Sequence, residues 1–411
     1  MELENSTLRI KKALADLTTF NSTPDQGVTR FPFTNEAKQA SAYLQKLMEE
    51  IGLKVYLDNS GSVIGRLEGQ VAATIMTGSH LDSVQNGGAY DGIAGVVASI
   101  EALRLFQEQG IRPYYSYEVI ATNDEEGARF STGLFTGKVL LGQLTVEDIK
   151  GYKDADGISV YQAMKDYGLK PEEIGEHKRK DLKAFVEVHI EQGPILEMQQ
   201  KNIGVVDAIV GMKRALITIN GRADHSGTMP MHLRKDAMEV AAKVIAKIGD
   251  RARKYPPAVA TVGNLTVEPN VVNIVPSKVK FFIDFRATDA EIIKTMYREM
   301  LADLDHYCQE FNMNYTTEET LWVEPVHLQE ALKNYIEESC QKRNFSHMHI
   351  ISGAGHDAQV FGAQIPAAMI FVPSIGGRSH CPEENTDPAT LAMAAQVACD
   401  TLVKINTDKS F

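Results

Sequence analysis

Residues 78–95, GSHLDSVQNGGAYDGIAG, combine polar side chains that could bind a ligand with five glycines. His80, Asp82 and Asp91 supply one imidazole and two carboxylates within this short segment. The apolar run at 72–76 in front of it predicts a buried strand, and the residues behind it predict a helix. The segment is therefore either an ordinary glycine-rich turn or a place where these three side chains hold something between them.

Three further stretches that predict strands also end in acidic residues or histidines. These residues are Asp124, Glu125 and Glu126 after one strand, His189 at the end of the next, and His380 after a third. Ligands of an open α/β sheet bind at the carboxyl ends of its strands, so we expect these side chains to meet. Imidazole with carboxylate suits zinc, manganese or cobalt. One carboxylate shared by two ions would hold them about 3.5–4 Å apart for hydrolysis.

Taken singly, each of these residues has a plainer interpretation. A histidine after a strand is more often a surface or capping residue. GGAYDG is more often a tight turn in which Asp91 caps a helix, and NDEEG is more often a solvated acidic loop. Four strand ends that each deliver such a side chain within one domain favour a metal site over four unrelated turns.

The composition is that of a soluble globular protein of 411 residues, with 44% hydrophobic and 23% charged residues. That length predicts two domains. The net charge of −12 argues against a nucleic-acid partner. The N-terminal segment lacks the apolar core of a signal peptide, and no apolar run approaches the length of a membrane span. The four cysteines lack CxxC spacing and predict no disulfide framework, so we expect a cytoplasmic protein.

Alternating strands and helices predict an α/β domain with a mixed, mostly parallel sheet that is flanked by helices. The clearest elements are a helix at 35–53, a hairpin at 54–69 and a helix at 91–110. Residues 208–322 have instead the βαββαβ order of a ferredoxin-like domain. We expect this domain to be inserted, so that the first domain is discontinuous and consists of residues 1–207 and 323–411.

Six blocks of sequence, spread over nearly the whole chain, carry a resemblance to a known family: GSHLDSVQNGGAYDG, NDEEGARF, EVHIEQG, GRADHSGTMP, NVVNIVPSKVKFFIDFRA, and SGAGHDAQ with SHCPEE. Together they closely resemble the hydantoinase/carbamoylase group of the M20 metallopeptidase-like family. That group contains N-carbamoyl-L-amino-acid amidohydrolases, allantoate amidohydrolases and β-ureidopropionases. The resemblance implies a hydrolase of carbon–nitrogen bonds other than peptide bonds, with a catalytic domain and an inserted lid and dimerisation domain.

The resemblance also implies two divalent metal ions per subunit, which in the group are zinc, manganese, cobalt or nickel. One ion would be bound by Asp91, Glu126 and His380, and the other by His80, Asp91 and His189. Asp91 is thus the implied bridging carboxylate. Many relatives in the wider family have a carboxylate in place of His189, so the match is to the amidohydrolase branch. The histidines that match no metal block are expected to be surface or structural residues: His177, His232, His306, His327, His347 and His349.

Three further residues are implied to act in catalysis. Asp82 would orient the ring of His80. Glu125 would take a proton from the attacking water and pass it to the leaving nitrogen. His225, in the HSGTMP block, would donate a hydrogen bond to the oxyanion of the tetrahedral intermediate. It is implied to reach the site of a partner subunit, and thus a homodimer joined through residues 208–322, although without the resemblance it is better interpreted as a loop histidine.

Four residues are candidates for binding the substrate. Asn273 and Arg286 are implied to hold its carboxylate, for which a guanidinium fork is well suited. The alternative for Arg286 is a surface ion pair at the end of an edge strand. Gln192 would either hydrogen-bond a carbamoyl group or cap a turn. His356 lies in a glycine-rich loop that is either a substrate contact or only a turn.

The first hypothesis for the reaction is hydrolysis of an N-carbamoyl-L-amino acid to the amino acid, carbon dioxide and ammonia. The second is hydrolysis of allantoate, because Lys213 and Arg214 are similar to the double-basic stretch of allantoate amidohydrolases, which must hold a second ureido group. An aminoacylase or dipeptidase of the same family, and a non-catalytic binding protein that keeps the fold, are further alternatives. The presence of all five ligands and of Glu125 argues against the last of these.

Overall fold

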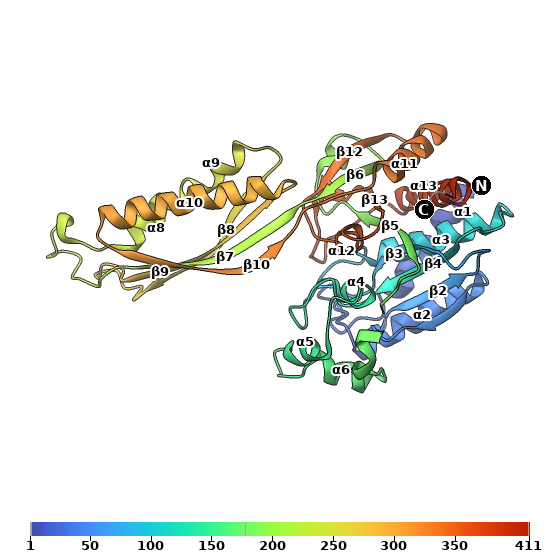
Figure 1. Ribbon diagram of the computed structural model, residues 1–411, viewed down its shortest axis with the longest axis horizontal. Helices are drawn as coiled ribbons and strands as arrows, with labels where there is room; N and C mark the ends of the chain where they lie inside the picture. Colours follow the sequence, from blue (N-terminus) through green and yellow to red (C-terminus); the bar gives the residue numbers. More distant parts are fainter. Residues whose placement is uncertain (1, 177, 410) are drawn as a thin grey trace. The chain divides into compact units, whose positions relative to one another are not determined.

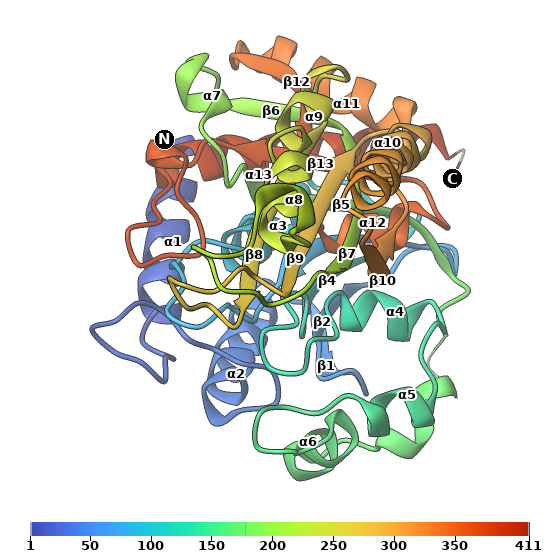
Figure 2. The same cartoon turned by 90° about the vertical axis from the view of Figure 1, so that its left-hand side faces the viewer.

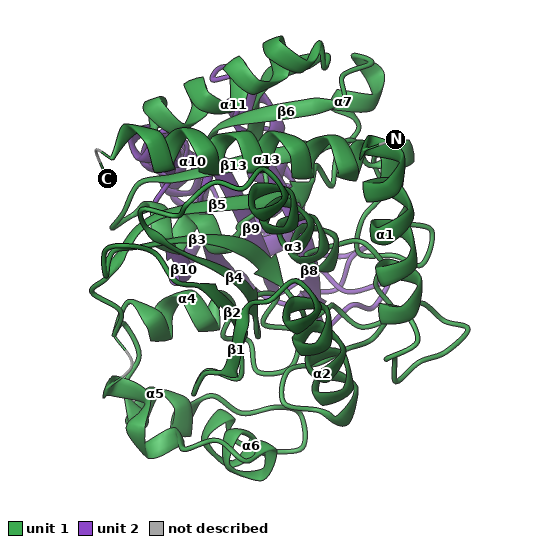
Figure 3. Ribbon diagram, turned by 90° about the vertical axis from the view of Figure 1, so that its right-hand side faces the viewer, with its two compact units in different colours: residues 1–207, 328–411 green, residues 208–327 purple. Residues whose placement is uncertain are grey.

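The computed structural model describes residues 2–176, 178–409 and 411 (Figure 1; Figure 2). The chain forms two compact units: unit 1 consists of residues 1–207 and 328–411, and unit 2 of residues 208–327 (Figure 3). The boundary predicted after residue 322 falls inside a strand, Asn314–Val323, that pairs within unit 2. The whole strand belongs to unit 2 because it pairs with another strand there, and the sequence pattern does not reveal that pairing.

The larger sheet has nine strands within the described part of the chain, in the order β1-β2-β4-β3-β5-β13-β6-β11, with β12 paired to β6. Their bounds are β1 (Lys54–Leu57), β2 (Val63–Leu67), β3 (Thr74–His80), β4 (Ser116–Thr122), β5 (Leu182–Ile190), β6 (Ile203–Ile209), β11 (Val326–His327), β12 (His347–Ser352) and β13 (Ala367–Val372). The central strands β4, β3, β5 and β13 pair in parallel, and antiparallel pairs lie on either side of them. The predicted mixed sheet and the predicted hairpin, which is β1–β2, are confirmed.

The central parallel strands are buried on both faces. Every residue of β3, β4 and β13 is buried, and the sequence of β13, AAMIFV, is accordingly a continuous apolar run rather than an alternating one. Parallel strands place their carboxyl ends at one edge of the sheet. The residues that end or follow β3, β4, β5 and β13 therefore gather at that edge.

Helices cover both faces of this sheet. Those of unit 1 are α1 (Glu2–Leu17), α2 (Asn35–Glu50), α3 (Ile93–Glu108), α4 (Phe135–Leu140), α5 (Val146–Gly151), α6 (Val160–Tyr167), α7 (Ile195–Met198), α11 (Glu330–Arg343), α12 (Asp357–Gly362), α13 (Pro388–Asp408), and the short 3₁₀ helices η1 (Pro171–Glu176) and η3 (Ile375–Gly377). α3 contacts β3, β5 and α13, and Figure 3 shows α1, α3 and α13 on the same side of the sheet. α3 is apolar on nearly every side because it is enclosed in the core. α12 packs on β5 and β13 from the opposite face (Figure 1).

Unit 2 contains the four-stranded antiparallel sheet β10-β7-β9-β8. Its elements in chain order are β7 (Gly211–Asn220), η2 (Met231–Leu233), α8 (Ala237–Ile245), α9 (Ile248–Arg253), β8 (Val259–Glu268), β9 (Lys278–Ala287), α10 (Ala290–Glu310) and β10 (Asn314–Val323). Apart from the short η2 and the division of the first helix into α8 and α9, this is the predicted βαββαβ order. Burial alternates along β7 and β9, because α8 and α10 pack on one face of the sheet (Figure 2).

The helix α10 illustrates how the sequence specifies unit 2. Asp289 caps its first turn by accepting a hydrogen bond from the main-chain N–H of Glu291 at 2.8 Å. Its buried residues recur every three or four positions and form the face that packs on the sheet: Ile293, Met296, Met300, Leu304 and Cys308. An amphipathic helix of this kind needs the sheet beside it to bury that face.

Two features of the chain bear on its location. Among the described residues, no helix combines the length and the apolar character needed to cross a membrane. All four cysteines are free thiols. The cytoplasmic location stays a prediction.

A small polar cluster lies in unit 1, at the two positions where the chain passes between the units, after residue 207 and before residue 328. The main-chain oxygen of Asp207 accepts a hydrogen bond from the N–H of Leu328 at 2.9 Å. The Asp207 carboxylate accepts hydrogen bonds from His349 Nδ1 at 2.8 Å and from Lys333 Nζ at 3.0 Å. This hydrogen bond from the imidazole to Asp207 raises the pKa of His349 above its ordinary value of 6.5. His349 is therefore a structural residue, as the sequence predicts.

Replacing His349 with glutamine should remove a pH-dependent part of the stability. Because folding raises the pKa of His349, its ion pair stabilises the folded protein below about pH 6.5, and the contribution is lost as the pH rises through the raised pKa. The side chain is 44% exposed, so solvent screening limits the contribution to below about 1 kcal/mol. The measurement is the free energy of urea unfolding at about pH 6 and about pH 9. His232→Gln, at an exposed position outside the cluster, is the control. An equal difference between wild type and His349→Gln at both pH values would contradict the assignment.

Candidate metal centre

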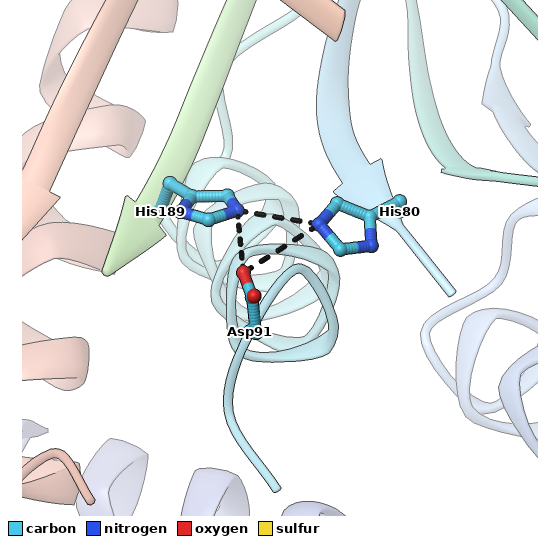
Figure 4. A group of neighbouring side chains, drawn as sticks. All are labelled: His80, Asp91 and His189. Carbon is cyan, nitrogen blue, oxygen red and sulfur yellow. Dashed lines mark hydrogen bonds and ion pairs between the residues drawn. The ribbon is translucent and has the colours of Figure 1, made fainter. Parts of the chain in front are cut away.

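His80, Asp91 and His189 form a buried group at the carboxyl ends of β3 and β5 (Figure 4). His80 is the last residue of β3, His189 lies near the end of β5, and Asp91 lies just before α3. Asp91 Oδ1 is 3.2 Å from His189 Nε2 and 3.7 Å from His80 Nε2. The two Nε2 atoms are 3.4 Å apart. The three side chains therefore point at one common position.

Main-chain carbonyl groups fix the tautomer of both histidines. His80 Nδ1 lies 2.9 Å from the main-chain oxygen of Asp82, and His189 Nδ1 lies 2.8 Å from that of Ile190. A carbonyl oxygen only accepts, so each Nδ1 must carry a hydrogen and donate it. In the neutral rings both Nε2 atoms then present lone pairs to each other and to the Asp91 carboxylate. Three electron-pair donors that face one another in this way suit a cation.

A second group of candidate ligands shares the same carboxylate. His380 Nε2 lies 3.1 Å from Asp91 Oδ2 and 3.3 Å from Glu126 Oε1. Asp91 thus turns one oxygen toward His80 and His189 and the other toward His380. The two groups differ in exposure, since the side chain of His189 is 1% exposed and that of His380 is 49% exposed. All five predicted ligands therefore meet in two groups that Asp91 connects.

The oxygens of this centre fit a positively charged occupant. Asp91 Oδ1 and Glu126 Oε1 are buried, and neither accepts a hydrogen bond of good geometry from the described residues. A buried carboxylate oxygen without a donor costs free energy unless a charge of opposite sign lies beside it. Together with the lone pairs of the histidines, these two atoms match the oxygen and nitrogen ligands of divalent transition metals.

Charge in the centre is distributed as such a site requires. Burial opposes protonation of His80, but the carboxylates of Glu125 and Asp91 outweigh it and raise the pKa of His80 well above its ordinary value. Burial would raise the pKa of Asp91, yet the neighbouring imidazoles of His189, His380 and His80 hold that pKa well below its ordinary value. The bridging position therefore carries a negative charge in an environment that favours cations.

Glu125 lies beside the ligands without joining either group. Its Oε2 is 3.9 Å from His80 Nε2, and the side chain is 8% exposed. Burial raises the pKa of Glu125 well above its ordinary value, and the repulsion of Glu126 raises it further. A carboxyl group with a raised pKa binds a proton more readily than an ordinary glutamate, which suits a group that takes up and releases protons.

The sequence predicts that Asp82 orients His80. The sequence does not specify which atom of Asp82 makes the contact. The main-chain oxygen of Asp82, not its carboxylate, lies next to His80 Nδ1. The carboxylate instead accepts hydrogen bonds from the N–H groups of Glu125 at 3.1 Å and Glu126 at 3.2 Å. It holds the turn after β4, which carries the candidate base and one ligand.

One glycine of the opening segment is required by close packing. Gly92 has a φ of +66°, and a Cβ atom there would lie 2.3 Å from His80 Nδ1. Any side chain at this position would push the His80 ring away from Asp91. The segment therefore doubles back through Gly92 so that His80 and Asp91 can share one site.

Gln192 also contacts the bridging carboxylate. Its Nε2 donates a hydrogen bond to Asp91 Oδ2 at 2.9 Å, and its main-chain N–H donates to Ser374 Oγ at 3.0 Å. Gln192 and His380 both have a left-handed backbone, with φ of 61° and 57°. Non-glycine residues in that region are strained and cluster at functional sites. Gln192 thus holds Asp91, a role beyond the two that the sequence predicts for it.

His356 is not placed to touch a substrate, contrary to one of its two predicted roles. The residue is 1% exposed, and its ring centroid lies 4.4 Å from that of His189. Ser352 Oγ lies 2.9 Å from His356 Nε2. Burial and the neighbouring His189 hold the pKa of His356 well below its ordinary value. It is a neutral packing residue behind a ligand, because α12 begins beneath β5 and encloses it.

In unit 2 the chain brings His225 and Asn273 together. An isolated β-bridge pairs His225 with Ile274, and Asn273 accepts a main-chain hydrogen bond from Ser226 at 3.0 Å. The N–H of Gly227 donates to His225 Nδ1 at 3.0 Å, so the hydrogen of the neutral ring is on Nε2. His225 and Asn273 are both exposed. The neighbourhood offers a hydrogen-bond donor, Nε2–H, on an accessible loop.

The three basic residues of unit 2 that are candidates for substrate binding have different surroundings. Arg286 Nε and Nη2 donate to the two oxygens of Asp284 at 2.9 and 3.1 Å, and Arg214 Nε donates to Asp284 Oδ2 at 2.9 Å. Lys213 is buried on the helix-covered face, pairs with Glu319 and lies over the rings of Tyr297 and Trp322. The substrate role predicted for Lys213 is therefore not supported, because its side chain is only 10% exposed and its ammonium group is already paired. Arg286 is paired with Asp284 as well, but its side chain remains 24% exposed.

Arg286 and the pair His225–Asn273 lie toward opposite ends of the unit 2 sheet. Asn220 of β7 pairs with Lys278 of β9 at one end, and Arg286 lies eight residues further along β9 (286 − 278 = 8). At 3.3–3.4 Å per residue that is a distance of about 27 Å. The loops that follow β7 and precede β9, which carry His225 and Asn273, lie beyond the first end (Figure 1). One copy of unit 2 therefore does not bring Arg286 to the other two residues.

The sequence did not single out two acidic residues near the centre. Glu187 is fully buried in β5 and accepts hydrogen bonds from Ser79 Oγ and from the N–H of Ala358, each at 2.8 Å. The available sequence signal for Glu187 was its position two residues before His189, in the mostly apolar run LKAFVEVHI. Glu384 directly follows Glu383, and nothing in the sequence distinguishes them. Of the histidines outside the metal blocks, His177 lies outside the described residues, and the other five are exposed or half-buried.

The comparisons with known proteins agree with this geometry. Residues 76–404 match the sequence profile of peptidase family M20/M25/M40. The chain is 39% identical to an N-carbamoyl-L-amino-acid amidohydrolase of Paenarthrobacter aurescens over 95% of both chains. It is 35% identical to an allantoate amidohydrolase of Bacillus subtilis, over 98% of this chain and 100% of that one. A solved amidase of the hydantoinase/carbamoylase family from Burkholderia multivorans superposes with a TM-score of 0.90 at 31% identity and 97% coverage of each chain. The chain therefore belongs to peptidase family M20/M25/M40 and, within it, to the hydantoinase/carbamoylase group.

Proposed function

We propose that this protein is a metal-dependent amidohydrolase that cleaves a ureido or carbamoyl C–N bond in a small substrate with a free carboxylate. The observation that carries the proposal is Asp91, one carboxylate that faces two groups of ligands, with Glu125 beside both and in neither. The names of relatives that match over nearly the whole chain support this class of reaction.

The proposal includes two divalent ions, which the ligand types limit to metals such as zinc, manganese, cobalt or nickel. One would be held by His80, Asp91 and His189, and the other by Asp91, Glu126 and His380. When bound, such a pair supplies a Lewis acid that makes water a nucleophile near neutral pH. The unpaired oxygens Asp91 Oδ1 and Glu126 Oε1 support this assignment.

Glu125 is the proposed general base and acid. Its carboxylate would receive the proton of the attacking water and deliver it to the leaving nitrogen. The raised pKa and the position outside both ligand groups support this role, since a carboxylate committed to a metal could not shuttle a proton. Asp82 keeps the carboxyl group in place by binding the main chain of Glu125 and Glu126.

Two copies of the chain are proposed to complete one site. His225 would donate its Nε2–H to the oxyanion, and Asn273 and Arg286 would hold the substrate carboxylate. Because Arg286 lies about 27 Å along the sheet from the end beyond which the other two lie, one substrate can meet all three only if they come from different copies. We therefore propose a homodimer joined through residues 208–322, in which His225 and Asn273 serve the partner's site.

The preferred substrate is an N-carbamoyl-L-amino acid, and allantoate is the alternative. Relatives of both names match at similar identity. The argument for allantoate depends on two free basic residues, and Lys213 is already paired with Glu319. Arg214 shares Asp284 with Arg286. The surroundings of Lys213 thus favour an N-carbamoyl-L-amino acid over allantoate as the substrate. The proposed location is the cytoplasm, which the four free thiols support.

Purified protein loaded with manganese should release ammonia from a panel of N-carbamoyl-L-amino acids. The same assay with allantoate should give lower kcat/KM, because Lys213 is not available for a second ureido group. Dipeptides and N-acetyl amino acids test the remaining members of the family. Turnover of those compounds alone would refute the proposed reaction, and turnover of allantoate alone would replace the carbamoyl substrate with the alternative.

Glu125→Gln should retain bound metal and lose turnover by a factor of at least about 100, because an amide cannot carry the proton. Metal content by elemental analysis and kcat on the best substrate are the two measurements. Glu147→Gln, at an exposed position on α5, is the matched control and should leave both unchanged. Retained turnover in Glu125→Gln would remove this residue from the role of base.

Arg286→Ala should raise KM by about 10–100-fold with a smaller change in kcat, since hydrogen bonds to a charged group contribute about 1.5–3 kcal/mol each. Arg286→Lys keeps the charge but not the fork, and should recover only part of the loss. Arg253→Ala, at a position that is 76% exposed, is the control. Steady-state kinetics that are unchanged in Arg286→Ala would exclude this residue from the carboxylate clamp.

A further inference from the structure

The ligand group of Asp91, Glu126 and His380 is the more open of the two, and its histidine is on a loop. His380 follows β13 and the short helix η3, outside any regular element, with a strained backbone at φ 57°. Its side chain is 49% exposed, so packing does little to hold it. Something else must keep the loop that carries His380 close to Asp91.

The carboxylate of Glu384 makes that connection. Its Oε1 accepts hydrogen bonds from the main-chain N–H groups of Tyr90 and Asp91, each at 2.9 Å. Its Oε2 accepts one from Ser379 Oγ at 2.7 Å. Glu384 is 4% exposed. One buried side chain thus binds both the segment of the bridging carboxylate and the residue next to His380.

Two neighbours show that the position is built for this carboxylate. A Cβ atom at Gly88 would lie 2.0 Å from Glu384 Oε1, so the glycine leaves the space that the carboxylate fills. Ser379 Oγ lies 3.3 Å from Asp91 Oδ2 as well as beside Glu384. The preceding residue, Glu383, is 63% exposed and pairs with Arg378 at the surface. Only one of the two adjacent glutamates faces the centre.

We propose that Glu384 is a positioning residue that locks the His380 loop onto Asp91 and thereby sets the affinity of the open metal position. Both of its oxygens already accept hydrogen bonds from protein donors, so it acts through Asp91 and His380 and not as a ligand. In the buried position, two of the three side chains, His80 and His189, stand on strands β3 and β5, so that position is less sensitive to Glu384. This inference rests on the proposed function, because it assumes that the two groups bind metal.

The experiment measures stepwise Zn²⁺ affinities by competition with a chromophoric chelator. The proteins are wild type, Glu384→Ala, Glu384→Gln, and Glu383→Ala as matched control. His380→Ala removes a ligand of the open position and so identifies which binding step belongs to it. Glu384→Ala should weaken that same step by about 10–100-fold and leave the other within about threefold. Glu384→Gln should recover part of the loss, since its amide oxygen still accepts from Tyr90 and Asp91, and Glu383→Ala should match wild type.

The outcomes separate the inference from the function on which it rests. Wild type that fails to bind two ions would overturn the proposed function and this inference with it. Wild type with two ions and a Glu384→Ala variant with both affinities unchanged, or both weakened equally, would overturn the inference alone. If Glu384→Ala does not fold, as judged by its thermal unfolding without metal, Ser379→Ala decides by the same criteria. Ser379→Ala removes the link from Glu384 to the His380 loop, together with the weaker contact of Ser379 Oγ with Asp91 Oδ2, and should weaken the same step by a smaller factor.

Discussion

One buried carboxylate, that of Asp91, is the constraint on which the rest of this centre depends. A negative charge away from water is costly unless donors and cations surround it. Histidines from three parts of the chain point their Nε2 atoms at its two oxygens, and Gln192 donates to one of them. Four parallel strands that end at one edge of a sheet make this convergence possible, because no single segment could supply all of these groups.

The backbone does as much of the positioning as the side chains. Carbonyl oxygens of Asp82 and Ile190 set the tautomers of two histidines, and the N–H groups of Glu125 and Glu126 bind the carboxylate of Asp82. Gly92 contributes by the absence of a side chain. Such contacts fix ring orientation more firmly than flexible side chains would, and they explain how a loop-built site keeps its geometry.

The convergence of the candidate ligands could be predicted because residue type and position coincide: each lies at the end of a strand or in the loop after it, and the apolar runs of these strands are plain in the sequence. Other features depend on contacts that spacing does not reveal. Glu384 binds the main chain of Asp91 across 293 positions of sequence, and Glu383 beside it binds only a surface arginine. Lys213 and Arg214 read as one basic pair, yet strand alternation sends them to opposite faces of the unit 2 sheet. Such pairs are distinguished only once the chain is folded.

The length of the strands in unit 2 determines which active site of the proposed dimer an inactivating substitution affects. In the proposed dimer, a substitution at His225 or Asn273 inactivates the site of the partner subunit, whereas a substitution at Glu125 inactivates the site of the subunit that carries it. A mixed dimer with one chain of each kind would therefore concentrate both defects in one site and leave the other whole. Two alleles that are each inactive alone would therefore complement one another. Intragenic complementation would thus report the architecture of the dimer.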